Sequence, residues 1–594
     1  MKIQDTPQPS VDNKVSAPVI YHLAIERFRG IKALSWHPAS GVNVILGGGD
    51  VGKTTILDAI GLLLSPNNST LLFDTDYHAR DDKAGFVIEA VIALPPTSGI
   101  NNQIKPSWPW NWNDSKAVVP AIDENDITKS EPVYRLRVRG TEELDLAYEI
   151  VQPDGTTDSL TVALRRAIGL VRLSGDDRND RDLRIVQGSA LDRLISDKGL
   201  RSRLASKLAK NDIRGELTDS ARDVLKELDV AFKAKSLPNG LDLAIAGGQG
   251  LSITALIGLT AECEGMHLPL ASWGTGTRRI AALTIAEQNQ GEAPVTLVDE
   301  VERGLEPYRQ RSLMEKLQAG KSQAFVTTHS SSVISAVSKG GIWYVDHEGR
   351  IGSLESTKIA KHRKSDPETF LARLTIVAEG ATERGFVTVL LEKSLDSLEQ
   401  HGVHICDGGG HETTLDLLEA LAAGGLRFGG FADDEDGRHA ARWKKVEEKL
   451  DKLLFRWPSG CLEENIIGSL PNDKLETLLK DPADEKTGER LRTLADRLGS
   501  SDKTFATIKK MAGSDLKALI LAATLGTVPK DKMSEKKQYQ AHGQRWFKTF
   551  DGGHELAEKV FSLGLWPKLK PQIIPFCNAV RKAVGLAEIQ DLTP

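Results

Sequence analysis

The stretch "GVNVILGGGDVGKTTILDAIGLLL" (residues 41–64) reads as a strand, a glycine-rich loop and a helix. Its centre, "GGGDVGKT", fits the pattern G-x-x-x-x-G-K-[ST]. In such a loop glycines let backbone N–H groups curl around phosphates, while the lysine reaches the β- and γ-phosphates and the threonine hydroxyl holds Mg²⁺. The sequence therefore predicts a nucleotide site, with Gly47, Gly52, Lys53, Thr54 and Thr55 as its residues.

Three later segments narrow the class of ATPase. "PVTLVDE" (294–300) is an apolar strand ending in Asp299, which would hold Mg²⁺, and Glu300, which would position or deprotonate the attacking water. "FVTTHS" (325–330) is another apolar strand, and it places His329 to sense the γ-phosphate. "ASWGTGTRRIAAL" (271–283) offers a second helix start that faces phosphate, and its predicted residues are Ser272, Gly274 and Gly276.

The bulk properties limit the remaining classes. The chain has 594 residues, enough for roughly three or four domains, and a net charge of −6, so a nucleic-acid partner would need local basic patches. Its four cysteines form no C-x-x-C pair, which argues against a zinc knuckle or a disulfide framework. We find no apolar run long enough for a membrane helix and no hydrophobic signal region, and we expect a cytoplasmic protein without a membrane partner.

The order of elements predicts an α/β protein with two main domains. Residues 1–18 read as a disordered polar tail and 19–355 as the ATPase, with a helical insertion at 185–236 that could serve dimerisation. Residues 356–370 are polar and basic and read as a linker. A fresh series of alternating strands and helices fills 371–594, which implies a second domain with a parallel sheet.

Carboxylates gather at two strand ends of this second domain. "VAEGATE" (377–383) places Glu379 after a strand and Glu383 one helical turn later. Two strand–helix units on, "FADDEDGRHA" (431–440) contains four consecutive carboxylates. The carboxyl ends of parallel strands share one edge, so these groups can converge, and hard cations such as Mg²⁺ or Mn²⁺ would offset their charge. The alternative is a solvated acidic turn.

The ligand set has an open register. We prefer Asp434 and Asp436 as ligands, with Asp433 and Glu435 as the alternative pair. "CLEENIIGSL" (461–470) offers Glu463 and Glu464, of which we choose Glu464 as an extra ligand. In "QRWFKTF" (544–550) Lys548, flanked by aromatic residues, could neutralise charge in a transition state, or it could be an ordinary surface lysine.

The order of the first set of motifs resembles ABC-type ATPases, in which the signature of one protomer completes the ATP site of another. The resemblance implies a head-to-head homodimer or higher oligomer through the ATPase half. There are two departures. The signature reads "SWGTG", and no Q-loop glutamine is found, with Asp74 and Asp76 the only acidic candidates nearby.

The pattern E-G-x-[ST]-E followed by D-x-D resembles the Toprim domain. An ABC-type ATPase followed by Toprim in one chain resembles the OLD (overcoming lysogenization defect) family of nucleases, over about residues 18–590. The late "WFKT" lysine and the length resemble the class paired with a UvrD-like helicase, which includes Gabija-type phage-defence nucleases.

This resemblance implies a divalent-metal-dependent DNA endonuclease in anti-phage defence or DNA processing, with two ions in the Toprim site and one with ATP. The implied metal ligands are Glu379, Glu383, Asp434, Asp436 and Glu464, and the implied catalytic residues are Glu300, Glu379 and Lys548. A RecF-like ATPase that binds DNA without cutting is the alternative. A Toprim topoisomerase is disfavoured because Tyr539 is the only tyrosine after residue 350.

Overall fold

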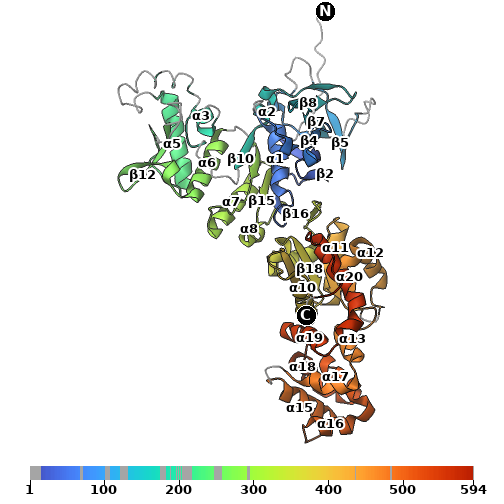
Figure 1. The fold of residues 1–594 in the computed structure, drawn as a ribbon. Coiled ribbons are helices and arrows are strands. Elements are labelled where there is room, and N and C mark those ends of the chain that lie inside the picture. Colours follow the sequence, from blue (N-terminus) through green and yellow to red (C-terminus); the bar gives the residue numbers. More distant parts are fainter. Residues whose placement is uncertain are drawn as a thin grey trace, which may run out of the picture. The chain divides into compact units, whose positions relative to one another are not determined.

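A computed structural model describes residues 15–592, except 67–70, 101–106, 121–130, 174–181, 187–188, 196, 198–199, 201–202, 204–216, 246–256, 290–293, 435–436 and 482–484. The chain divides into two compact units, one of 1–46 with 52–343 and one of 47–51 with 344–594. Figure 1 shows both as mixtures of helices and strands, which confirms the predicted α/β class.

The first unit has a mainly antiparallel sheet. It begins with a hairpin, in which β1 (Val19–Phe28) pairs antiparallel with β2 (Ile31–Trp36). β1 also pairs with β4 (Phe86–Ala93), and β4 pairs with β7 (Glu131–Gly140). The remaining strands of this sheet are β5 (Trp110–Asn113), β6 (Lys116–Val118), β8 (Leu146–Val151) and β9 (Thr157–Ser159).

The nucleotide motifs lie on a second sheet of order β10-β14-β15-β3-β16-β17. Its strands are β10 (Leu170–Leu173), β14 (Val295–Val298), β15 (Ala324–Thr327), β3 (Val42–Leu46), β16 (Gly341–Val345) and β17 (Ile351–Ser353). β10, β14, β15 and β3 pair in parallel. Every residue of β14, β15 and β3 is buried, as continuous apolar strands covered on both faces require.

The helices of this unit follow from the strand–helix alternation. They are α1 (Lys53–Leu64), α2 (Val162–Ile168), α3 (Ala190–Ile195), α5 (Asp219–Ala234), α6 (Thr275–Asn289), α7 (Pro307–Ala319) and α8 (Ser331–Ala336). α1 begins directly after the glycine loop, where Gly52 takes a φ of 99° that a residue with a side chain rarely adopts.

The insertion is more than the helical segment that the sequence predicts. α3 and α5 fall inside 185–236, and part of that range lies outside the described residues. Their core is shared with a three-stranded antiparallel sheet of β11 (Asp242–Ile245), β12 (Ile257–Cys263) and β13 (Met266–Pro269). The β12–β13 hairpin turns at Glu264 and Gly265, both with positive φ, a turn signal that we did not read from the sequence.

The second unit is built on a parallel sheet of order β19-β18-β20-β21. Its strands are β18 (Leu374–Ala378), β19 (Val403–Asp407), β20 (Gly429–Ala432) and β21 (Leu454–Arg456). The helices that follow these strands are α10 (Ala381–Leu395), α11 (His411–Ala423), α12 (Ala440–Leu450) and α13 (Leu462–Ser469). The second parallel sheet expected from the sequence is thus present.

The rest of this unit is helical. Its helices are α14 (Leu475–Leu479), α15 (Thr487–Leu498), α16 (Phe505–Ala512), α17 (Leu516–Leu525), α18 (Lys536–Arg545), α19 (Phe550–Ser562) and α20 (Trp566–Ala583). In Figure 1, α15 to α18 gather at one end of the unit, while α10 packs on β18 and α20 packs on β21. One hydrophobic core joins the sheet to these helices, from Leu374 to Leu592.

The segment expected to be a linker is folded. Residues 356–370 contain α9 (Thr357–Ser365) and a 3₁₀ turn, Pro367–Phe370, and the compact unit already begins at Tyr344. Ser356 caps α9 by accepting a hydrogen bond from the N–H of Lys358, and Ile359 and Phe370 are buried. The polar composition that suggested a linker is the solvent face of a docked helix.

Candidate metal and nucleotide sites

The carboxylates of the second unit follow the ends of its parallel strands. Glu379 comes directly after β18, and Asp433 directly after β20. Glu383 lies in the first turn of α10, and Glu463 in the first turn of α13. All four side chains are buried. The carboxyl edge of the sheet therefore brings together residues more than 80 positions apart.

These carboxylates line one pocket of about 620 Å³. The residues that surround it are Glu379, Gly380, Ala381, Thr382, Glu383, Gly410, Asp433, Arg438, Gly460, Cys461, Glu463, Glu464, Leu525 and Lys548. Five of them carry a carboxylate, and two, Arg438 and Lys548, are basic. Oxygen donors in this number are what hard divalent cations prefer, so the residues present fit Mg²⁺ or Mn²⁺.

Glu379 is held by hydrogen bonds from two neighbouring elements. The backbone N–H of Asp433 donates to Glu379 Oε2 at 2.9 Å. His411 Nδ1, at the start of α11, lies 3.2 Å from the same oxygen. The strand ends of β18 and β20 are thereby joined through one side-chain oxygen.

The acidic run divides at Asp433. Asp433 Oδ1 accepts from the N–H of Leu462 at 3.0 Å, and the side chain lines the pocket. Asp434 Oδ1 instead accepts from Arg456 Nη2 at 2.9 Å, and Asp434 is not among the pocket-lining residues. The preferred register placed Asp434 in the site, and the structure places its neighbour there. Asp436, with Glu435, lies outside the described residues.

The two glutamates after β21 have different neighbours. Glu464, the residue chosen from the sequence, accepts from the N–H of Cys461 at 2.9 Å and so completes the capping box at the start of α13. Glu463 is more deeply buried, at 2% exposure, and its charge acts on both Glu383 and Asp433. Both glutamates line the pocket, but Glu463 couples to the other carboxylates.

Burial and mutual repulsion raise the pKa of two of these groups. For Glu383 the causes are burial first and then the charges of Glu463 and Glu379, while Lys548 opposes the shift. For Asp433 burial again comes first, followed by Glu383, Glu379 and Glu463. Both shifts favour the protonated forms of these two carboxyls, and a bound cation would displace such protons.

Close helix packing places Lys548 opposite these carboxylates. A Cβ on Gly385 of α10 would lie 2.0 Å from the carbonyl oxygen of Phe550, and a Cβ on Gly553 of α19 would lie 1.9 Å from that of Thr382. The two glycines let α10 and α19 meet backbone to backbone. Thr382 Oγ1 also donates to the carbonyl of Phe547 at 3.2 Å, so the residue before Lys548 is bonded to the helix that carries Glu383.

The residues predicted to bind the nucleotide meet around Asp299. Its Oδ1 accepts from Thr54 Oγ1 at 3.1 Å and from Thr327 Oγ1 at 2.5 Å. Lys53, at the start of α1, is buried. The P-loop threonine and the Walker B aspartate thus occupy the adjacent positions that a shared Mg²⁺ requires. Thr55 lies in the first turn of α1, beside them in the chain.

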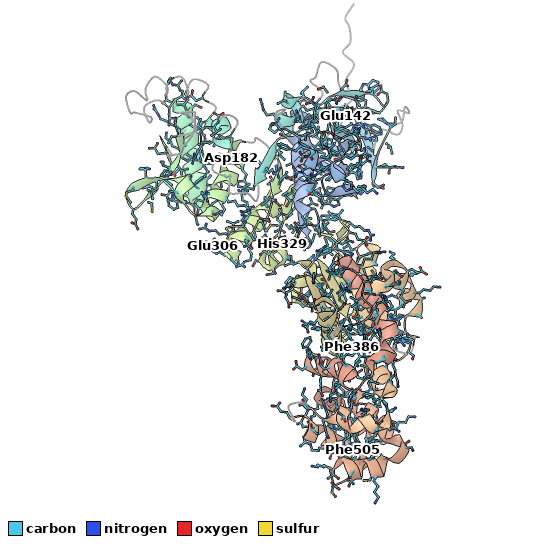
Figure 2. All side chains as sticks on the ribbon, in the orientation of Figure 1. Glu142, Asp182, Glu306, His329, Phe386 and Phe505 are labelled. Carbon is cyan, nitrogen blue, oxygen red and sulfur yellow. The ribbon has the colours of Figure 1, made fainter. Side chains whose placement is uncertain are left out.

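Glu300 and His329 lie at the ends of neighbouring strands of this sheet. Glu300 has a φ of 47°, and its N–H donates to Thr327 Oγ1 at 2.8 Å. The N–H of His329 donates to Glu302 Oε1 at 2.7 Å, and burial together with the positive charge of Lys53 lowers the pKa of the imidazole. Figure 2 labels His329 in this part of the unit.

The predicted signature segment, 271–283, packs against the loop that follows Asp299 and Glu300. A Cβ on Gly276 would lie 2.0 Å from the carbonyl oxygen of Gly304. Ser272 Oγ donates to the carbonyl of Pro269 at 2.7 Å and remains near solvent, and Gly274 precedes α6 with open space at its Cα. In the expected Q-loop position, Asp76 accepts from Arg29 Nε at 2.9 Å, and Asp74 lies 3.8 Å from Arg80.

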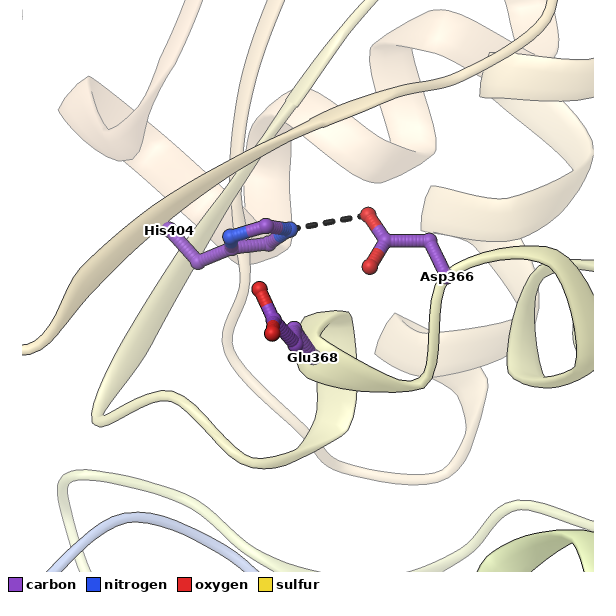
Figure 3. Close-up of side chains that lie close together, drawn as sticks. All are labelled: Asp366, Glu368 and His404. Atoms are coloured by element: carbon purple, nitrogen blue, oxygen red, sulfur yellow. Dashed lines mark hydrogen bonds and ion pairs between the residues drawn. The ribbon is translucent and has the colours of Figure 1, made fainter. Parts of the chain in front are cut away.

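A separate histidine–carboxylate group lies elsewhere in the second unit. Asp366, Glu368 and His404 bring their oxygen and nitrogen atoms within 4.8 Å of one another, and His404 Nε2 lies 2.8 Å from Asp366 Oδ2 (Figure 3). His404 pairs in register with Thr375, three residues before the end of β18. This group bonds the Pro367–Phe370 turn to β19 and is not part of the pocket lining.

Two family models match the chain in sequence. An AAA domain model, whose description refers to the AbiEii toxin and Type IV TA system, matches residues 127–335. A model described as the TOPRIM domain of overcoming lysogenization defect protein-like proteins matches residues 370–433. The chain matches an OLD-family ATPase–Toprim protein. The OLD-like Toprim match covers β18 to β20, with Glu379, Glu383 and Asp433.

Other comparisons are distant or empty. Among curated proteins, none matches the sequence. A Smc head bound to the C-winged helix domain of ScpA is similar at 16% identity and a TM-score of 0.36, covering 58% of this chain and 99% of that one. RecF with ATP is similar at 15% identity and a TM-score of 0.34, covering 57% of this chain and 98% of that one. A Smc head bound to the C-terminal domain of ScpA from Pyrococcus furiosus is similar at 15% identity and a TM-score of 0.35, covering 58% of this chain and 98% of that one.

The sequence analysis missed two residues at the OLD-like Toprim site and ranked two others second. Arg438 lines the pocket from the turn before α12, and no sequence pattern marked it. Glu463 and Asp433 were visible, but only as alternatives. His411 follows the conspicuous "DGGG" run after β19, and that glycine signal could have indicated a residue held close to the site.

No helix among the described residues is both long and apolar enough to cross a bilayer.

Proposed function

We propose that the chain is an ATP-binding and ATP-hydrolysing, divalent-metal-dependent DNA endonuclease. The observation that carries this is the convergence of Glu379, Glu383, Asp433 and Glu463 in one pocket with Lys548 beside them. Four buried carboxylates repel one another, and burial together with this repulsion raises the pKa of Glu383 and of Asp433. A structural role would not require this arrangement, whereas phosphodiester hydrolysis with two ions would.

In this proposal Glu379, Glu383, Asp433 and Glu463 hold two ions, Mg²⁺ or Mn²⁺. Asp433 and Glu463 replace Asp434 and Glu464, which the sequence favoured, because Asp434 is paired with Arg456 and Glu464 caps α13. When bound, two divalent ions would supply an activated water and stabilise the leaving oxygen. Glu379 and the other three carboxylates hold the ions in position, and Lys548 offsets the negative charge that develops on the phosphate.

The ATPase half regulates or powers this centre through the nucleotide site at Lys53, Thr54 and Asp299. Glu300 positions the attacking water, and His329 senses the γ-phosphate. One further Mg²⁺ would accompany ATP. We further propose that the signature around Ser272 and Gly274 serves a second copy of the chain, so that ATP joins two ATPase halves.

The wider setting rests on the OLD-family match and resemblance alone. It suggests a cytoplasmic role in anti-phage defence or DNA processing, with a UvrD-like helicase as a partner.

Incubation of supercoiled plasmid with the purified chain tests the activity. Mn²⁺ should convert the plasmid to nicked or linear forms, and EDTA should prevent this. Glu379→Ala should abolish conversion while leaving ATP hydrolysis near the wild-type rate. A protein that binds DNA but leaves the plasmid supercoiled under all conditions would support the non-cutting alternative instead.

A further inference from the structure

A chain of three buried side chains runs from α12 to the metal-binding edge. Trp443 Nε1 donates to His411 Nε2 at 3.1 Å, and His411 Nδ1 lies 3.2 Å from Glu379 Oε2. We propose that His411 is a positioning residue for the Glu379 carboxylate and that Trp443 fixes its tautomer. This inference rests on the proposed function, because it assigns a role at the same centre.

The indole determines where the histidine proton lies. An indole N–H can only donate, so His411 Nε2 must accept and cannot carry a proton. The proton of the neutral ring then resides on Nδ1, which faces the Glu379 carboxylate. Because the tautomer follows from a donor that cannot reverse, Nδ1 is a fixed donor to Glu379.

The surroundings make this contact rigid. The side chains of His411 and Glu379 are 5% and 8% exposed, and Trp443 is fully buried. The loop before His411 is bonded to the same place, because the N–H of Gly410 donates to the Glu379 carbonyl at 2.8 Å. Gly409 and Gly410 have φ of 77° and 103°, so this tight turn depends on glycine.

Both donors reach the same carboxylate oxygen. Oε2 of Glu379 accepts from His411 and from the N–H of Asp433, whereas Oε1 meets no donor among the described residues. Oε2 is thus occupied by the protein, and Oε1 is the atom left for a cation. A neutral histidine orients the carboxylate without adding a positive charge that would repel the ion, which is the usual arrangement of a residue behind a metal ligand.

The same sheet supplies a matched control. His404 on β19 also bonds a carboxylate, Asp366 Oδ2 at 2.8 Å, but that pair does not line the pocket (Figure 3). His404→Ala therefore removes a histidine–carboxylate contact of the same kind, from the strand that precedes His411. If any effect of His411 arose only from lost packing in this unit, both substitutions would produce it.

The experiment measures Mn²⁺ binding to the full chain by titration calorimetry, alongside plasmid nicking and thermal unfolding. His411→Ala should weaken Mn²⁺ binding by about 10- to 100-fold, the usual cost of losing such a partner. His411→Asn, whose amide nitrogen can replace Nδ1, should recover most of the affinity, whereas His411→Gln should not. Trp443→Phe keeps an aromatic side chain but removes the N–H donor, so either nitrogen of His411 can carry the proton. This variant should lose less Mn²⁺ affinity than His411→Ala. His404→Ala should leave Mn²⁺ binding at the Glu379 pocket as it is in the wild type.

Two results would overturn the inference. One is wild-type Mn²⁺ affinity in His411→Ala, and the other is an equal loss in His411→Asn and His411→Ala. The binding measurement also separates this inference from the nuclease proposal. If the wild type binds Mn²⁺ and the variants follow the predicted order of affinity, but no protein nicks DNA, the role of His411 and Trp443 stands and the nuclease proposal is refuted. A wild-type chain that binds no Mn²⁺ would refute both.

Discussion

The backbone N–H of Asp433 donates to Glu379 Oε2 at 2.9 Å, although the two residues are 54 positions apart. This bond aligns the residue after β20 with the residue after β18. Successive side chains of an extended segment point to opposite sides, so Asp434 leaves the pocket when Asp433 enters it. Its carboxylate meets Arg456, on the neighbouring strand β21. One backbone bond thus selects which aspartate faces the candidate metal site.

Separate substitution of Asp433 and Asp434 tests which of the two faces the candidate metal site. Asp433→Asn should abolish plasmid nicking and Mn²⁺ binding, because it removes a charge from the centre. Asp434→Asn should retain most of both activities, since it weakens an ion pair with Arg456 that is partly exposed and worth about 1 kcal/mol or less. Nicking rates of the two purified variants in Mn²⁺ decide the matter. Loss in Asp434→Asn with normal cutting by Asp433→Asn would restore the register preferred from the sequence.

The two chemical centres should respond separately to substitution. Lys53→Ala should remove ATP binding, and Glu300→Gln should retain binding but slow hydrolysis by at least about 100-fold, as loss of a group that positions water does. Neither change touches the carboxylates at Glu379 and Glu383, so Mn²⁺ binding should be unaltered. Phosphate release and nucleotide binding are measured on both variants. Phosphate release at the wild-type rate from Glu300→Gln would contradict the assigned role.

Trapping ATP should also reveal association. If the signature at Ser272 serves another copy, Glu300→Gln with ATP should have a larger mass by light scattering than the same variant without nucleotide. The double variant with Lys53→Ala is the control, because it cannot bind the nucleotide that would join the copies. A strictly monomeric Glu300→Gln protein at saturating ATP would exclude ATP-driven dimerisation.

The raised pKa values of Glu383 and Asp433 predict an unusual dependence of stability on pH. In the metal-free chain these groups keep their protons as pH rises above the ordinary carboxyl range, whereas the unfolded chain loses them. Stability should therefore fall as pH rises from about 4 toward their raised pKa values. Mn²⁺ replaces the protons, so its stabilising effect should grow with pH. Thermal unfolding in EDTA and in Mn²⁺ between pH 5 and 8 measures both trends.

Glu383→Gln with Asp433→Asn provides the control for that prediction. The double variant carries no ionisable group at either position, so its metal-free stability should be less sensitive to pH than that of the wild type. An equal slope in the variant and the wild type would assign the pH dependence to other groups.

The close approach of α10 and α19 should be required to hold Lys548 opposite the carboxylates. Gly553→Ala places a Cβ 1.9 Å from the Thr382 carbonyl, so α19 must move. We expect a loss of about 1–3 kcal/mol in the free energy of unfolding and a slower nicking rate. Gly488→Ala in α15 is a matched control, because a Cβ there meets nothing within 4 Å. A Gly553→Ala protein with wild-type stability and cutting would show that this contact is dispensable.

The sequence predicted the α/β architecture because its signals are local. The P-loop flanks, the apolar strands that end at Asp299 and at Glu379, and the order of strands and helices each need only a short window. The linker prediction differs from the structure for the same reason. α9 looks polar in isolation, and only its packing, with Ile359 and His362 buried, shows that it belongs to the second unit.

The details of the candidate metal site depend on contacts that no local pattern contains. The choice between Asp433 and Asp434 follows from a bond to Glu379 and from the position of Arg456 on another strand. Glu464 bonds back to the start of α13, whereas Glu463 is buried beside Glu383 and Asp433. Such choices require the sheet register, and a single sequence does not specify register to one residue.

The most direct test of the account is the rate at which supercoiled plasmid is nicked in Mn²⁺ by the wild type, Glu379→Ala and Lys53→Ala. The account predicts metal-dependent nicking by the wild type, none by Glu379→Ala, and full Mn²⁺ binding by Lys53→Ala, whatever the effect of ATP on its cutting. Nicking by Glu379→Ala at the wild-type rate, with contaminating nuclease excluded by a mock purification, would contradict a metal centre at the edge formed by β18 and β20.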